Sequence, residues 1–210
     1  MSRLDGPVLA AAIDRLAAVD ADIAAAVARI GYPIPRLRTP GFATLLQIMV
    51  AQQISVRAAA AIWARTVQAC GPAVSAERFL ALDDDALRAI GLSRRKMAYG
   101  RGLAQAVSSG ALDLDSLAVR PEAEAVAAIS ALHGFGRWSA EIYLLFALGR
   151  TDSFPGDDLA VQVGMQRLKG LVQRPDRKQM DALAEPWRPH RGCAALLLWH
   201  VYGSATLDPS

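Results

Sequence analysis

Cysteine is scarce in this chain, with two residues in 210, Cys70 and Cys193. Two thiolates cannot hold a four-cysteine iron–sulfur cluster, so a cluster of that kind is excluded. The two residues lie far apart in the sequence and no secretory signal accompanies them. We therefore expect free thiols rather than a disulfide.

Long apolar runs are absent as well. The longest, residues 193–201, is interrupted by His200 and is too short to cross a bilayer, so we expect no contact with a membrane. The first residues lack the basic segment and cleavage site of a signal peptide, which predicts a cytoplasmic protein. Metal-binding spacing is also missing from the three histidines, which are His133, His190 and His200.

Strand-like alternation of apolar and polar residues is missing throughout, whereas apolar residues recur at the three- and four-residue steps of a helix. Hydrophobic residues make up 53% of the chain, which is enough for a core. The sequence therefore predicts a single all-α unit without a linker or repeats. Among the expected helices are those at about 7–30, 41–53, 76–82, 84–90, 121–131, 137–148 and 189–201.

The net charge of +3 permits nucleic-acid binding without demanding it. A basic run at residues 94–96 begins an expected helix after Ser93. Its side chains suit a solvated helix face and a phosphate contact equally well, and the sequence leaves both readings open.

A glycine turn lies between two expected helices in the segment 132–140, LHGFGRWSA. Because Gly134 and Gly136 lack a Cβ, both can adopt a positive φ and allow another backbone to approach closely. Amides at the start of the second helix favour a phosphate there, and Arg137 adds a positive charge. A turn of this kind also joins ordinary helix pairs, so the motif alone does not establish DNA binding.

An acidic pair, Asp157 and Asp158, stands at an expected helix start in the segment 154–159, FPGDDL. Adjacent residues at that place cannot point the same way, and aspartate after Pro-Gly is a common helix cap. A fixed carboxylate can also stabilise a sugar that becomes positively charged, and it can orient the attacking water.

Several separated motifs occur in the same order as in one family, and the similarity extends from about residue 42 to 199. Besides the two segments above, they are AQQISV at 51–56, IGLS at 90–93 with Lys96, and PWR at 186–188. The chain resembles the helix-hairpin-helix DNA glycosylases, specifically the alkylpurine branch typified by DNA-3-methyladenine glycosylase II.

The resemblance assigns roles to individual residues. It implies that Asp158 is the catalytic carboxylate and that Asp157 is the cap that shapes the turn. It places Trp138, Trp187 and Tyr143 around the extruded base, whereas Trp63 and Trp199 are expected in the core.

The resemblance also assigns the contacts with the DNA strand. Gly134, Gly136 and Arg137 would hold the DNA backbone, and either Gln53 or Ile54 would be the wedge that fills the space of the extruded base. A monovalent cation would bind the main-chain carbonyls of Ser130, Leu132 and Phe135.

Two positions depart from relatives of this family. Trp138 stands where bifunctional members carry a lysine nucleophile, so the resemblance implies hydrolysis by water without cleavage of the strand. His133 stands where proline is usual, which predicts a looser turn.

The resemblance further implies two helical lobes around a cleft within one unit, 1–210. The N- and C-terminal segments would form one lobe and residues of about 45–150 the other, with the hairpin at 125–148. We expect a monomer that excises 3-methyladenine and 7-methylguanine from double-stranded DNA, with no required cofactor and a nucleoid-associated role of bacterial type. Two alternatives are a glycosylase for oxidised or mismatched bases and a non-catalytic sensor of DNA damage.

Overall fold

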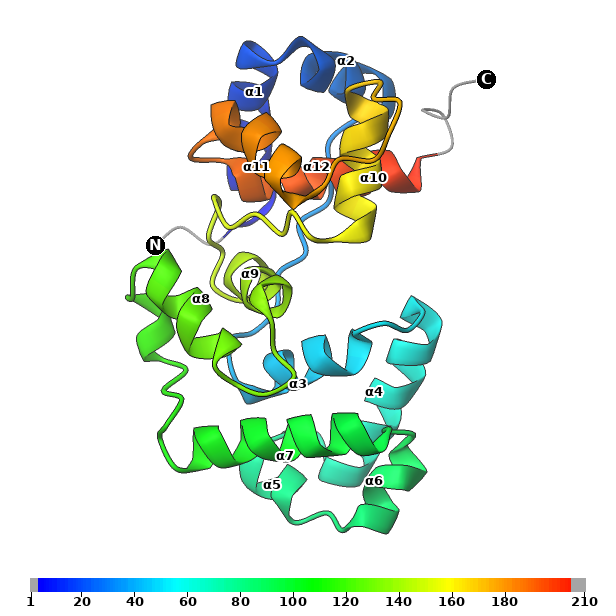
Figure 1. The fold of residues 1–210 in the computed structure, drawn as a ribbon, viewed down its shortest axis with the longest axis vertical. Coiled ribbons are helices and arrows are strands. Elements are labelled where there is room, and N and C mark those ends of the chain that lie inside the picture. Colours follow the sequence, from blue (N-terminus) through cyan, green and yellow to red (C-terminus); the bar gives the residue numbers. More distant parts are fainter. Residues whose placement is uncertain (1–3, 205–210) are drawn as a thin grey trace. The chain divides into compact units, whose positions relative to one another are not determined.

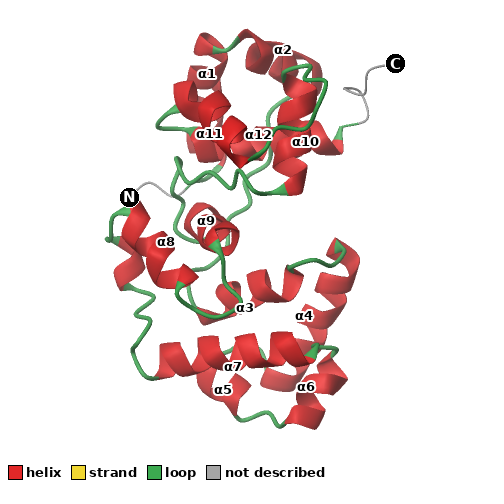
Figure 2. Ribbon diagram, viewed as in Figure 1, coloured by secondary structure: helices red, strands yellow, loops and turns green. Residues whose placement is uncertain are grey.

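The computed structural model describes residues 4–204, and its regular elements in this range are all helices, as the sequence predicts (Figures 1 and 2). The α-helices are α1 Gly6–Val19, α2 Ala21–Ile30, α3 Phe42–Ala51, α4 Val56–Cys70, α5 Ala76–Leu80, α6 Asp84–Ile90, α7 Arg94–Ser108, α8 Glu122–Ser130, α9 Arg137–Phe146, α10 Leu159–Leu168, α11 Arg177–Ala184 and α12 Arg191–Gly203. Two short 3₁₀ helices are η1 Ser116–Ala118 and η2 Glu185–Trp187.

One expected helix is divided in two. Residues 7–30 form α1 and α2 because Asp20 adopts an extended backbone between them, and its carboxylate accepts hydrogen bonds from the amides of Asp22 and Ile23. Asp20 is therefore an N-cap, a role that the apolar periodicity of the segment does not reveal.

The chain forms two compact units, which divide within α9. The first unit comprises the residues up to Leu37 and those from Leu144 onward. In it, α10 packs against α12 so closely that a Cβ at Gly164 would lie 2.2 Å from the carbonyl oxygen of Leu198. This approach places the start of α10 beside the side chains of α12.

The second unit comprises residues 38–143, which include the helices α3 to α8 (cyan to green in Figure 1). Helix α3 is buried along most of its length and packs against α4 and α7. Gly100 of α7 lies against the Phe79 ring, which a Cβ would approach to 2.7 Å. The packing of α3 against α7 positions the end of the first helix and the start of the second, and both lie beside the loop at 52–55.

Both cysteines are free and buried, as the sequence predicts. Burial raises the pKa of the Cys193 thiol to about 12. In the described part of the chain, no helix has the length and apolar character needed to cross a membrane.

Candidate nucleic-acid interface and active site

The hairpin turn joins α8, which ends at Ser130, to α9, which begins at Arg137. Gly134 has a φ of 88°, and a Cβ at this residue would lie 2.2 Å from the Tyr99 ring. Both the backbone conformation and the packing therefore require glycine here. The His133 ring packs edge-on against Tyr99 with 4.9 Å between the ring centroids. The turn thus has its own packing partners at the position where proline is usual.

Gly136 differs from Gly134. Its φ lies outside the left-handed region, so the positive φ that glycine permits is not adopted at this residue. A Cβ at Gly136 would meet no atom within 4 Å. The space beside Gly136 is open, at the start of a helix whose first amides have no acceptor within the helix. This is the arrangement that the close approach of a phosphate requires.

Arg137 also begins α9. Its Nε donates a hydrogen bond of 2.8 Å to Oε1 of the buried Glu141, and 57% of its side-chain area stays exposed. The pair holds the guanidinium group at the same helix start as Gly136.

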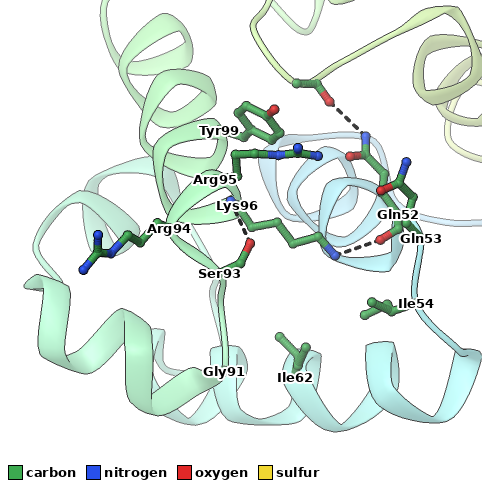
Figure 3. Close-up of a pocket in the computed structure, with 11 residues that line it drawn as sticks. Gln52, Gln53, Ile54, Ile62, Gly91, Ser93, Arg94, Arg95, Lys96 and Tyr99 are labelled. Carbon is green, nitrogen blue, oxygen red and sulfur yellow. Dashed lines mark hydrogen bonds between the residues drawn. The ribbon is translucent and has the colours of Figure 1, made fainter.

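A hollow of about 740 Å³ lies within the second unit between the 52–55 loop, the start of α7 and Gly134 (Figure 3). In Figure 3 Arg95 points into the hollow and Arg94 points away from it. Lys96 forms neither a solvated helix face nor a phosphate contact, the two roles that the sequence leaves open for the basic run. Its Nζ donates to the carbonyl oxygens of Val50 at 2.7 Å and Gln52 at 2.9 Å.

Gln52 joins the loop to the hairpin. Its Nε2 donates to the carbonyl oxygen of Gly134 and to the Ser139 hydroxyl, both at 2.9 Å. The next residue, Gln53, is exposed and has a φ of 56°, the one non-glycine residue with a positive φ between residues 4 and 204. Ile54 is 38% exposed and also lines the hollow.

Two residues expected around the base differ in exposure. Trp138 is partly exposed on the first turn of α9, as a pocket wall requires. The Tyr143 side chain is fully buried, and its hydroxyl accepts a hydrogen bond of 2.9 Å from the amide of Gly41. Tyr143 therefore fixes the start of α3 in this structure and presents no ring face to a base.

Asp158 is the N-cap of α10. Its Oδ1 accepts hydrogen bonds from the amides of Ala160 at 2.9 Å and Val161 at 3.1 Å, and from Nε1 of Trp199 at 3.0 Å. Three N–H donors on one oxygen fix the orientation of the carboxylate, and the helix start favours its negative charge.

The assignment of the capping role to Asp157 is wrong. Asp157 is exposed, and its Oδ2 accepts a hydrogen bond of 3.1 Å from Arg177 on α11. The cap and the carboxylate that the resemblance nominates for catalysis are the same residue, Asp158. The sequence separates these two roles because the exact first residue of a helix is poorly defined by its pattern.

Trp187 is also placed differently from the expectation. It is 1% exposed, and its Nε1 donates to Oδ2 of Asp20 at 2.8 Å. The ammonium of Lys169 hydrogen-bonds the same carboxylate and lies 5.7 Å from the centroid of the Trp187 ring. Trp187 is therefore a core residue of the first unit in this structure and presents no face to a base.

Trp199 is a residue that the sequence reasoning missed. It was expected in the core and is buried there against Phe146, yet its indole N–H holds the Asp158 carboxylate. Arg36 lies over its ring at 5.3 Å from the centroid. The apolar stripe of α12 predicts the burial of the ring, but nothing in the sequence identifies its hydrogen-bond partner.

Of the expected cation ligands, Ser130 is the last residue of α8, and Leu132 and Phe135 lie in the turn that follows. The last carbonyl groups of a helix have no N–H partner within it. The carbonyl of Leu132 accepts a hydrogen bond from the amide of Phe135 at 3.0 Å. The hydroxyl of Ser130 is buried without a hydrogen-bond partner, so an oxygen that a cation would satisfy is present at this position. Among the described residues, no cluster of histidine, cysteine and acidic side chains could hold a metal ion.

A glycine hairpin between two helices, with an aspartate that caps a later helix of an all-helical chain, is typical of the helix-hairpin-helix class of DNA-repair proteins. The sequence profile described as "HhH-GPD superfamily base excision DNA repair protein" matches residues 46–189, more than half of the chain. The chain belongs to this superfamily, which confirms the resemblance that the motifs predict.

Individual relatives agree with the family. DNA-3-methyladenine glycosylase 1 of Schizosaccharomyces pombe is 31% identical over 74% of this chain and 69% of the relative. DNA-3-methyladenine glycosylase 2 of Escherichia coli is 28% identical over 85% of this chain, which spans 65% of that relative. The solved structure of an S. pombe 3-methyladenine DNA glycosylase in complex with abasic DNA has a TM-score of 0.84 and 27% identity, covering 90% of this chain and 94% of the other.

Proposed function

We propose that this chain is a monofunctional DNA glycosylase that hydrolyses the N-glycosidic bond of alkylated purines in double-stranded DNA. The observation that carries the proposal is the Asp158 carboxylate, which three N–H donors fix at the start of α10. Membership of a base excision repair superfamily and the names of the relatives support the same activity.

The chemistry follows from the charge that develops on the sugar. As the base leaves, the deoxyribose becomes an oxocarbenium-like cation, and a carboxylate with a fixed orientation stabilises it without reorganising. Asp158 also orients the water that adds to the sugar carbon. A purine alkylated at N3 or N7 already carries a positive charge, so it leaves as a neutral base without needing a protein acid to protonate it.

The second unit carries the residues that bind DNA in this proposal. The open space at Gly136 and the amides at the start of α9 suit a phosphate, and Arg137 adds a positive charge beside them. Trp138 is the candidate wall for stacking on an extruded base, and Gln53 or Ile54 is the candidate wedge. A monovalent cation at the carbonyls of the hairpin would add positive charge near the bound phosphate.

Because of Trp138, the proposed reaction removes the base without cleaving the strand. Its indole cannot attack the sugar to form an imine, which is the step that leads bifunctional relatives to strand cleavage. Water is therefore the nucleophile, and the product is an intact strand with an abasic site.

The test is incubation of the protein with methylated duplex DNA, followed by chromatography of the released bases. Release of 3-methyladenine and 7-methylguanine, with the strand intact until alkali is added, is the expected result. Release of oxidised or mismatched bases instead would favour a different glycosylase. Binding of damaged duplex without release of any base would favour a sensor and would contradict the proposal.

A further inference from the structure

The loop between α3 and α4 has an energetically costly backbone. Gln52 has φ −57° and ψ 131°, and Gln53 follows with φ 56°. This sequence of angles resembles a type II turn, whose second central position normally requires glycine. For a residue with a Cβ the left-handed conformation is strained, because the Cβ comes too close to the backbone. A loop without restraints would relax to a cheaper backbone, so the surrounding contacts hold Gln53 in this one.

The first restraint is the ammonium of Lys96. It donates to the carbonyl oxygens of Val50 and Gln52, on either side of the last residue of α3. These carbonyls are at the negative end of the helix dipole and lack donors within the helix. Burial lowers the pKa of Lys96, so its position on these carbonyls is not that of a freely solvated side chain.

The second restraint is the Gln52 side chain. Its amide nitrogen bonds both the carbonyl of Gly134 in the hairpin turn and the hydroxyl of Ser139 on α9. The loop is thereby hydrogen-bonded to the phosphate-binding turn within the same unit. Both restraints therefore act on Gln52, since Lys96 binds its main-chain carbonyl and the hairpin binds its side chain (Figure 3).

We propose that Lys96 and Gln52 are positioning residues for base extrusion, which hold Gln53 in its left-handed backbone at a fixed place relative to the hairpin turn. This inference rests on the proposed function. Extrusion of a paired base costs free energy, because stacking and pairing are lost. A wedge that is already ordered adds no further entropy cost when the base leaves the helix. Neither residue touches the reacting atoms, and both act through Gln53.

The central test uses Lys96→Met, which keeps most of the apolar stem and removes the donor. Single-turnover release of 7-methylguanine from a fully paired duplex should fall about tenfold, the loss expected when one side chain must be ordered during the reaction. With the same lesion opposite an abasic analogue, where no pairing has to be broken, the loss should shrink to about twofold or less. Combining Lys96→Met with Gln53→Ala should add little to the loss from Gln53→Ala alone.

The matched control is Lys178→Met, which removes an exposed lysine of α11 in the other unit. It should leave release from both duplexes unchanged. If Lys96→Met does not fold, Gln52→Glu replaces the donor amide by an acceptor of the same shape. It should give the same dependence on pairing, because it breaks the bond to Gly134.

A readout without base release separates this inference from the proposed function. A duplex that carries 2-aminopurine beside a non-hydrolysable lesion gains fluorescence when the stack is opened, whether or not the protein cleaves the base. Lys96→Met should reduce that gain, and Lys178→Met should not. Equal losses in paired and unpaired duplexes, additive effects with Gln53→Ala, or an unchanged fluorescence gain would overturn the positioning role.

Discussion

The indole N–H of Trp199 on α12 donates a hydrogen bond of 3.0 Å to Oδ1 of Asp158, the N-cap of α10. The bond joins two helices that pack through the Gly164 contact. It gives a tryptophan of the core a direct effect on the carboxylate proposed for catalysis.

Trp199→Phe tests that effect. The phenyl ring keeps much of the packing against Phe146 but removes the donor to Asp158. A hydrogen bond to a charged group contributes about 1.5–3 kcal/mol. If the bond orients the carboxylate for the transition state, single-turnover base release should fall by about tenfold or more. Duplex binding should persist, and a variant with normal release would show that the two α10 amides suffice to orient Asp158.

Trp187→Phe should behave in the opposite way. It removes the hydrogen bond to Asp20 in the core, so the free energy of unfolding should fall by about 2 kcal/mol. Base release per folded molecule should stay near that of the wild type. A large loss of release with unchanged stability would restore Trp187 to the base pocket.

Acid stability should change in the same variant. Burial raises the pKa of Asp20, but hydrogen bonds from Lys169 and Trp187 outweigh it, and the net pKa is below the ordinary 3.8. A lowered carboxyl pKa stabilises the fold above the unfolded value, and this stabilisation is lost as the pH falls through the folded value. Without the Trp187 donor the folded pKa should rise, which reduces the stabilisation and moves its loss to higher pH. Urea titrations between pH 2 and about 6 would measure the shift.

The two hairpin glycines should separate stability from DNA binding. Gly136→Ala adds a methyl group to open space, so its unfolding free energy should change by less than about 0.5 kcal/mol. Its binding of damaged and undamaged duplex should weaken alike, because phosphate contacts carry no sequence information. Gly134→Ala places a Cβ against Tyr99 at positive φ, so it should destabilise the fold. A loss in Gly136→Ala confined to one lesion would instead place Gly136 in base recognition.

Imine trapping tests the meaning of Trp138. Borohydride added during the reaction with damaged duplex should produce no covalent protein–DNA complex, since water is the proposed nucleophile. A related bifunctional glycosylase treated in parallel provides the positive control. A cross-linked band that survives denaturation would show that another group of this chain attacks the sugar.

The sequence predicts the helical fold and the hairpin because each depends on local patterns, whereas the candidate carboxylate, Asp158, comes from the resemblance to the glycosylases. Periodicity identifies the helices, and the glycine turn and the FPGDDL segment mark their ends. The roles of the tryptophans could not be predicted in this way. Trp187 and Trp199 are both buried, and their partners, Asp20 and Asp158, come from other parts of the chain. A hydrogen bond between distant residues leaves no mark on the spacing of either.

The backbone conformation of the loop before α4 could not be predicted from the sequence either. The resemblance places a wedge at Gln53 or Ile54, but the positive φ of Gln53 could not be predicted. The hydrogen bonds of the preceding Gln52 to Lys96 and Gly134 form only in the folded chain. Glycine likewise permits a positive φ without requiring it, and of the two hairpin glycines Gly134 alone adopts one.

The most direct test of the central claim compares wild type and Asp158→Asn in single-turnover release of 3-methyladenine and 7-methylguanine from methylated duplex DNA. Asparagine is also a good N-cap and keeps an oxygen for the bond from Trp199, so the fold should survive while the negative charge is lost. Release should fall by roughly a hundredfold or more, as when other electrostatic stabilisers are removed, with duplex binding retained. Asp157→Asn, at the exposed neighbour that pairs with Arg177, should keep nearly normal release. Near-normal release by Asp158→Asn together with loss in Asp157→Asn would contradict the account.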